Sequence, residues 1–182
     1  TTIFDHDLTF TTAGGVFSGS RLDPGTAVLL RTFEPPQSGH LLDLGCGFGP
    51  IAVGLAVAGP AVTVDAVDVN ALAVELTRVN AAEAGVADRV RATAPDDVPP
   101  DATYSQIWSN PPIRIGKEAL HTLLLTWLPR LTPDGVARLV VSKNLGGDSL
   151  QRWLIDQGYP TERVASTKGF RILEVSPAPS AA

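Results

Sequence analysis

The sequence predicts an α/β fold of the doubly wound kind. We expect seven strands in a mostly parallel sheet, with a β-hairpin at the N-terminus. Two observations support this class. Apolar runs of strand length alternate with helix-like segments along the chain. In addition, the apolar run at 41–44 leads into a glycine-rich stretch that ends at Pro50, which is typical of a buried parallel strand that turns sharply into a helix beside a ligand.

Composition and charge set the broad class of protein. The chain has 182 residues, 44% of them hydrophobic and 18% charged, which predicts one globular domain over 1–176 and a disordered tail over 177–182. One cysteine excludes a disulfide framework within the chain. With neither a membrane-spanning run nor a signal peptide, a cytoplasmic location is expected. A net charge of −5 argues against a broad electrostatic surface for nucleic acid but allows a local basic patch.

The first 40 residues are expected to form a hairpin and a helix that cover the cofactor site. Two β-prone pieces, 8–10 and 16–17, flank Gly14-Gly15. Asp23 is suited to cap the helix that runs to residue 33, with Pro24 as its first residue. Whether Asp23-Pro24 only starts this helix or also helps to cover the cofactor stays open. The run Asp5-His6-Asp7 is interpreted as solvated chain rather than a metal site, because alternating residues point to opposite faces.

The glycine-rich turn indicates a nucleoside cofactor. Gly45 and Gly47 allow the backbone to approach a bound nucleoside closely, and a helix over 51–58 follows with Pro50 in its first turn. Gly49 comes one residue earlier than the third glycine of the dinucleotide fingerprint, whose place Pro50 takes. NAD is therefore disfavoured.

The spacing from Asp43 through the three glycines resembles motif I of the class I methyltransferases that depend on S-adenosylmethionine (SAM). The resemblance implies a Rossmann-like fold, with a seven-stranded, mostly parallel sheet whose last strand is antiparallel, and SAM as the cofactor. It also implies that the glycine loop lies under the methionine part of SAM and that Asp43 helps to anchor it.

An acid stands at the carboxyl end of the second predicted strand, 62–68. Asp68 lies 23 residues after Gly45, and a carboxylate there can accept hydrogen bonds from both ribose hydroxyls. An uncompensated acid buried in the core would be costly, so a ligand role is favoured. Asn70 can either contact the ligand or cap the helix 71–83.

The other elements continue the alternation. Helix 71–83 places three apolar side chains on one face: Leu72, Leu76 and Val79. Further strands are expected at 89–94, 104–109, 136–141, 162–166 and 170–175. Further helices are expected at 118–128 and from a cap at Asp148 or Ser149 to about residue 157.

The turn Asn110-Pro111-Pro112, after the strand at 104–109, indicates catalysis. The prolines end the strand and stiffen the loop, which exposes the Asn110 side-chain oxygen and the Pro111 carbonyl. Two acceptors can hold both hydrogens of an exocyclic amine and aim its lone pair at the SAM methyl group. Turns of this kind are also common without a catalytic role, but its place in a chain with the glycine turn favours catalysis.

Together these residues resemble the methyltransferase small domain family, which includes ribosomal RNA guanine-N2 methyltransferases. The similar parts are 16–18, 22–26, 43–50, 68–70, 109–117 and 168–173. The catalytic residues expected from the resemblance are Asn110, Pro111, Pro112 and Ile113. The residues expected at the cofactor are Phe17, Asp43, Gly45, Cys46, Gly47, Gly49, Asp68, Val69, Asn70 and Asn110, with Asp96 or Asp97 facing the adenine amino group.

The sequence leaves the residues that contact the substrate open. Many relatives have an aromatic residue where this chain has Ile113, so stacking on the target base has to come from elsewhere, with Phe17 or Phe170 as candidates. Four cations are expected near the carboxyl ends of the strands, as a substrate-binding rim or as ordinary solvated charges: Arg21, Arg114, Lys117 and Lys143.

The sequence therefore predicts a SAM-dependent N-methyltransferase with no metal, acting on guanine N2 in ribosomal RNA. A protein-glutamine N5 methyltransferase acting on a release factor is the nearest alternative, and the net negative charge favours it slightly. A non-catalytic SAM-binding protein is a third alternative, against which the intact Asn110-Pro111-Pro112 turn argues.

Overall fold

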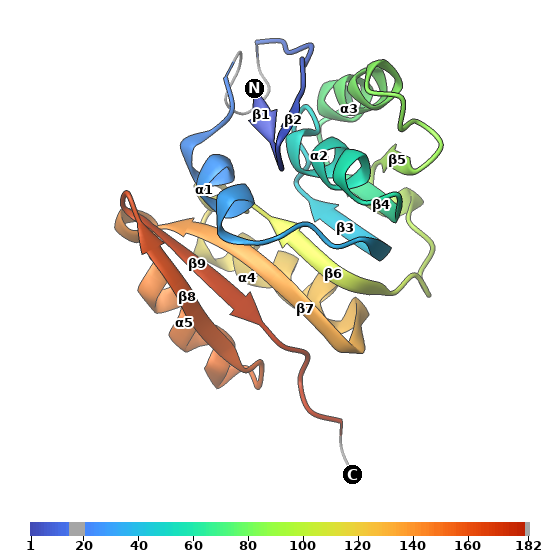
Figure 1. The fold of residues 1–182 in the computed structure, drawn as a ribbon. Coiled ribbons are helices and arrows are strands. Elements are labelled where there is room, and N and C mark those ends of the chain that lie inside the picture. The colour runs from blue at the N-terminus through green and yellow to red at the C-terminus, as the bar shows by residue number, and fades with distance from the viewer. Residues whose placement is uncertain (15–20, 181–182) are drawn as a thin grey trace.

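A seven-stranded sheet forms the centre of the structure, a computed structural model that describes residues 1–14 and 21–180. The strands are β3 (Ser38–Leu44), β4 (Ala61–Val67), β5 (Val90–Thr93), β6 (Tyr104–Ser109), β7 (Leu131–Ser142), β8 (Thr161–Thr167) and β9 (Phe170–Val175). Their order across the sheet is β5-β4-β3-β6-β7-β9-β8, and β9 runs antiparallel to both of its neighbours (Figure 1). The predicted α/β doubly wound fold is confirmed, including the antiparallel last strand.

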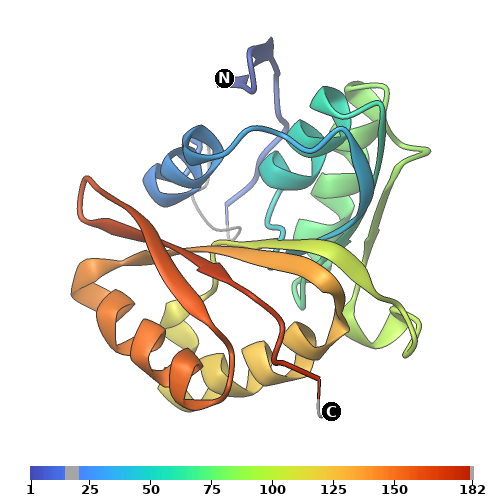
Figure 2. The same cartoon turned by 60° about the horizontal axis from the view of Figure 1, so that its bottom comes forward.

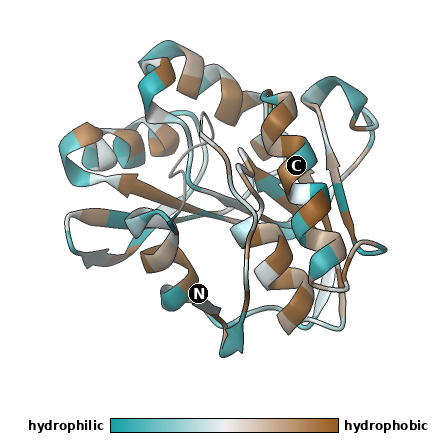
Figure 3. Ribbon diagram, turned by 90° about the horizontal axis from the view of Figure 1, so that it is seen from above, coloured by the Kyte–Doolittle hydropathy of each residue, from teal (hydrophilic) through white to brown (hydrophobic). Residues whose placement is uncertain are grey.

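Helices cover both faces of this sheet (Figures 1 and 2). One face carries α1 (Pro24–Thr32), α2 (Pro50–Ala58) and α3 (Ala71–Glu83), and the other carries α4 (Lys117–Trp127) and α5 (Gly147–Asp156). Successive strand residues point to opposite faces, so Leu41 joins the first buried cluster and Leu42 the second. In Figure 3 the central strands are mostly hydrophobic, while the helices alternate between hydrophobic and hydrophilic residues. Short 3₁₀ turns connect several elements: η1 (Pro95–Asp97), η2 (Ile113–Ile115), η3 (Leu128–Arg130) and η4 (Lys143–Leu145).

The N-terminal hairpin exists, but it lies earlier in the chain than expected. Its strands are β1 (Thr2–Ile3) and β2 (His6–Asp7), joined by Phe4 and Asp5 at φ of 49° and 65°. The buried side chain of Ile3 fixes this position, because it packs where a Cβ on Gly54 of α2 would stand. Residues 8–10 form no strand, and the expected second piece at 16–17 lies outside the described residues.

Helix α3 buries only part of its expected apolar face, and the expected side-chain cap of α5 is wrong. On α3 the buried face contains Ala73, Val74, Leu76 and Thr77, while Leu72 is 42% exposed, because the side with smaller residues fits closely against the glycine turn. Helix α5 begins at Gly147 with Gly146 at its N-cap position. Asp148 is unavailable for capping because its carboxylate pairs with Arg171 and Arg163, and Ser149 donates its hydroxyl to the Gly146 carbonyl instead.

Strand β7 begins at Leu131, five residues before the expected start. Leu131 pairs with Tyr104 of β6, and after an irregularity the regular ladder resumes where Val136 pairs with Gln106. Within the described residues no helix is long and apolar enough to cross a membrane, and no group of three or more His, Cys, Asp or Glu side chains is arranged to hold a metal ion.

Candidate active site

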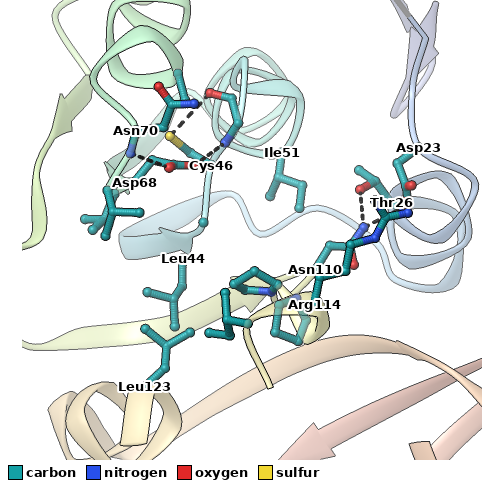
Figure 4. A pocket seen from close by; sticks show the side chains of 18 of the residues that line it. Asp23, Thr26, Leu44, Cys46, Ile51, Asp68, Asn70, Asn110, Arg114 and Leu123 are labelled. Atoms are coloured by element: carbon teal, nitrogen blue, oxygen red, sulfur yellow. Dashed lines mark hydrogen bonds between the residues drawn. The ribbon is translucent and has the colours of Figure 1, made fainter. Parts of the chain in front are cut away.

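A pocket of about 730 Å³ opens at the carboxyl ends of the parallel strands. Residues at or just beyond the ends of β3, β4, β5, β6 and β7 line it. Its lining includes Asp23, Thr26, Leu44, Gly45, Cys46, Gly47, Ile51, Asp68, Val69, Asn70, Pro95, Asn110, Pro111, Pro112, Arg114, Ile115, Leu123 and Phe170. Figure 4 shows the group around Asp68 and the group around Asn110 on different sides of this pocket.

The glycine turn between β3 and α2 forms one wall. Gly45, Gly47 and Gly49 have φ of 77°, 57° and 95°, a region that residues with a Cβ rarely adopt. Gly45 and Gly47 line the pocket, where they keep its wall free of side chains. Gly49 faces away, and a Cβ there would stand 2.9 Å from the Thr77 side chain. The three glycines therefore act in two ways: Gly45 and Gly47 leave backbone at the pocket wall, and Gly49 allows α3 to pack closely.

The turn is held from α3 and from β4. The Thr77 hydroxyl donates to the Gly47 carbonyl at 3.0 Å, and the amide of Asn80 donates to the Phe48 carbonyl at 2.7 Å. From β4, the Val67 carbonyl accepts from the Gly45 amide at 2.8 Å. The backbone of the turn is thus fixed before any ligand binds.

Asp68 connects the turn to the end of β4. Its Oδ2 accepts from the Gly47 amide at 3.0 Å, and its Oδ1 accepts from the Asn70 amide at 2.9 Å. Each carboxylate oxygen has two acceptor positions, so two remain for the hydroxyls of a ribose. Asp68 also lines the pocket, so its expected contact with the ribose is geometrically available.

Asp43 lies behind the turn and does not line the pocket. Its side chain is fully buried; Oδ2 accepts from the Ala52 amide at 3.0 Å, while Oδ1 has no hydrogen-bond partner within the described residues. The pKa of Asp43 is raised from 3.8 to about 7. Burial is the largest cause, the hydrogen bond from Ala52 opposes it, and the charge of Asp68 adds to it.

The adenine side of the expected site is apolar. Val69 is 88% exposed at the pocket wall, and Pro95 lines the pocket after β5. Asp96 and Asp97 are exposed and lie outside the lining, so a contact between either acid and adenine stays a prediction. Asn70 caps α3 by accepting from the Leu72 amide at 2.9 Å and also lines the pocket.

Asn110 lies across the pocket from the glycine turn, where β6 ends. Its Nδ2 donates to Asp23 Oδ2 at 2.8 Å and to Thr26 Oγ1 at 3.0 Å. The Ser109 hydroxyl donates to the Leu44 carbonyl at 2.7 Å and ties this strand end to β3. Sequence reasoning missed Thr26, although the spacing from Asp23 places it in the first turn of the same helix.

The other expected site residues are divided between the pocket and the surface. Arg114 and Phe170 line the pocket, whereas the cations Arg21, Lys117 and Lys143 are exposed outside its lining. Phe17 and the side chain of Ile113 lie outside the described residues. Cys46 lines the pocket but is buried, and burial raises the pKa of its thiol well above the ordinary value, so it is a poor nucleophile.

The strand order of this sheet is that of the class I methyltransferases. One pocket joins the glycine turn, the carboxylate of Asp68 at the end of β4 and the proline-stiffened Asn110, and this combination defines the same class. The model of the methyltransferase small domain matches residues 7–174. The chain belongs to this family. It is a SAM-dependent methyltransferase, and the cofactor expected from the sequence is confirmed.

Relatives and a solved structure support the same assignment. The chain is 35% identical over 174 residues to the uncharacterized protein YbxB of Bacillus subtilis, covering 93% of this chain and 86% of that protein. It is 36% identical to ribosomal RNA small subunit methyltransferase C of Pseudomonas aeruginosa over 92% of this chain, but this spans 51% of that protein. The structure of the T. thermophilus 16S rRNA N2 methyltransferase RsmC with AdoMet and guanosine superposes with a TM-score of 0.84 at 22% identity, covering 97% of this chain and 49% of that one.

We expect Asp43→Asn to remove a pH-dependent component of stability. Because the folded-state pKa of about 7 exceeds the ordinary 3.8, the folded chain binds the proton more tightly than the unfolded chain, and wild-type stability falls as the pH rises through this range. Relative to the variant, the wild type should lose about 3 kcal/mol of unfolding free energy between about pH 5 and about pH 8. Urea unfolding of both cofactor-free proteins measures this; a difference that does not change with pH would contradict the raised pKa.

We expect Asp68→Ala to weaken SAM binding by about 1.5–3 kcal/mol, the range for hydrogen bonds to a charged group. Calorimetric titration with SAM measures the loss, and circular dichroism checks the fold. Thr77→Val is the matched control, because it loosens the turn at Gly47 without removing the carboxylate and should cost less affinity. An unchanged SAM affinity in folded Asp68→Ala would exclude the ribose contact.

Proposed function

We propose that this methyltransferase transfers the SAM methyl group to an exocyclic amine, and that the amine is the N2 of a guanine in ribosomal RNA. The observation that carries the proposal is the placement of Asn110 and Pro111 in the same pocket as the glycine turn and Asp68. The cofactor and the amine-binding turn therefore belong to one cavity. The names of the curated relatives support RNA, rather than protein, as the substrate.

The residues fit the cofactor. Two glycines of the turn leave a wall without side chains, Asp68 retains acceptor positions for a ribose, and the exposed Val69 offers an apolar surface for a flat base. Asp43 retains an orphaned buried oxygen close behind the same wall. When bound, SAM supplies an electrophilic methyl group; all other contributions come from the chain.

Catalysis at Asn110 is positioning. The Asn110 oxygen and the Pro111 carbonyl accept the two amine hydrogens and so fix the direction of the nitrogen lone pair. The neutral nitrogen attacks, and its positive charge develops next to two oxygens that are already oriented. The extra proton leaves after transfer, so a strong base is not required at the start.

Arg114 favours a nucleic acid among amine substrates. It is a cation in the lining of the pocket of an acidic chain, and a guanidinium can bind a phosphate or the acceptor edge of guanine. A glutamine side chain would present the same two amide hydrogens to Asn110 and Pro111, so the choice between guanine and glutamine depends on such contacts around the amine.

Asn110→Ala should lose about a hundredfold or more in turnover while binding SAM nearly normally, because a contact that matters in the transition state is deleted. Asn110→Asp keeps an acceptor oxygen and should retain part of the activity. A single-turnover assay with a preformed enzyme–SAM complex separates transfer from binding. Wild-type turnover in Asn110→Ala would end the catalytic interpretation of this loop.

The substrate is tested by label transfer from methyl-labelled SAM to small ribosomal subunits, naked ribosomal RNA, DNA and a release factor, side by side. We expect label in ribosomal RNA, as N2-methylguanine after nuclease digestion and mass spectrometry. The product should be monomethylated, because a methylated amine has one hydrogen left for two acceptors and an unsatisfied polar group is costly. Label in the release factor alone would overturn the RNA assignment.

A further inference from the structure

The first turn of helix α1 holds the side chain of Asn110, 84 to 87 residues away in the sequence. Asp23, the N-cap of this helix, and Thr26 both face the pocket. Their oxygens receive the two hydrogen bonds from Asn110 Nδ2, at 2.8 Å and 3.0 Å, as the dashed lines in Figure 4 mark. Neither contact is required for the helix itself, since Asp23 caps α1 through the Gly25 and Thr26 amides.

The chemistry of the two partners determines which end of the Asn110 amide faces the pocket. An ionised carboxylate only accepts hydrogen bonds, so Asp23 can bind the NH₂ end of Asn110 and not its oxygen. The second NH₂ hydrogen is used by Thr26. The amide is planar, and its oxygen is at the opposite end of the group from Nδ2. Within the part of the chain that the structure describes, Asn110 Oδ1 receives no hydrogen bond, so it is available to a ligand.

Asp23 and Thr26, which bind Asn110, are themselves held in place. Thr26 is buried and sits in the first turn of α1. Oδ2 of Asp23, which accepts from Asn110, also accepts from the Gly25 amide at 2.8 Å and the Thr26 amide at 3.2 Å. Gly25 lets Phe170 approach, since a Cβ there would stand 3.0 Å from the ring. The start of α1 therefore packs against Phe170 of β9 and is also bound to Asn110 at the pocket.

We propose that Asp23 and Thr26 are positioning residues that lock the Asn110 amide with its acceptor oxygen toward the target amine. The proposal rests on the proposed function, because both residues act through Asn110. Without the lock, the amide can rotate by 180° and present NH₂ donors to an amine that needs acceptors. The carboxylate of Asp23 also polarises the amide and makes its oxygen a better acceptor, and its negative charge is complementary to the charge that develops on the attacking nitrogen.

Three variants separate this role from helix capping. Asp23→Ser keeps a good N-cap but its short side chain does not reach Asn110. Thr26→Val keeps the shape of the side chain and removes the acceptor. Thr32→Val is the matched control: it removes a threonine hydroxyl from the same helix, one that bonds the Val28 carbonyl at 2.7 Å and does not line the pocket.

The first readout needs neither cofactor nor substrate. In the ¹⁵N-labelled protein, the side-chain amide signals of Asn110, assigned with Asn110→Asp, should show slowed hydrogen exchange in the wild type and in Thr32→Val. In Asp23→Ser and Thr26→Val the signals should shift and the protection should be lost. Unchanged Asn110 signals in both of these variants would show that the lock does not exist in solution, and the proposal would be wrong.

The second readout is single-turnover transfer from methyl-labelled SAM to small ribosomal subunits. Asp23→Ser and Thr26→Val should lower the transfer rate about tenfold to a hundredfold, as expected for a misplaced catalytic group, with SAM affinity unchanged, while Thr26→Ser restores most of the rate. If Asn110→Ala is inactive but both lock variants transfer at the wild-type rate, the positioning role is excluded. If subunits accept no methyl group from the wild type, the RNA assignment fails, and the exchange experiment still decides whether the lock exists.

Discussion

The reversal of the chain between β3 and α2 is the constraint on which the rest of the structure depends. Within residues 45–49, the three glycines have positive φ values that other residues rarely adopt. The sharp turn that they form places Pro50 in the first turn of α2. The turn determines where the helix starts, how closely α3 can approach through Gly49, and which backbone faces the pocket. Asp68 and Thr77 hold it from two sides, so the wall of the cofactor pocket is part of the packing of the fold.

The pocket joins two halves of the sheet that have different tasks. The half formed by β3, β4 and β5 provides the glycine turn and Asp68, while β6 ends in the rigid Asn110 turn. Helix α1 packs against β7 and β9, and its capping residue binds Asn110. A side chain that starts a helix thus also binds the side-chain amide of Asn110. Under the proposed function, this second contact gives an ordinary N-cap residue a role in catalysis.

Errors in the sequence-based expectations have physical reasons. The expected hairpin used Gly14-Gly15, but Phe4 and Asp5 form the observed turn because Ile3 finds a space above Gly54 in α2. The residues of a turn do not reveal that space, because it is formed by a helix far along the chain. On α3, Leu72 is exposed although it shares a face with Leu76, because packing against the glycine turn buries the side that carries Ala73 and Thr77. At α5, distant arginines bind the acid that was expected to cap the helix.

The sequence by itself determined the fold class, the strand and helix sequence, the glycine turn, the acid after β4 and the Asn-Pro-Pro turn, because each depends on residues that are neighbours in the chain. The backbone freedom of glycine, the rigidity of proline and the alternation of apolar runs are local properties. Only the tertiary structure decided that Asp43 is buried with an orphaned oxygen, that Asp96 and Asp97 lie outside the pocket, and that α1 reaches Asn110. Burial and contact across 84 to 87 residues depend on how the elements pack, and no spacing within one segment encodes that.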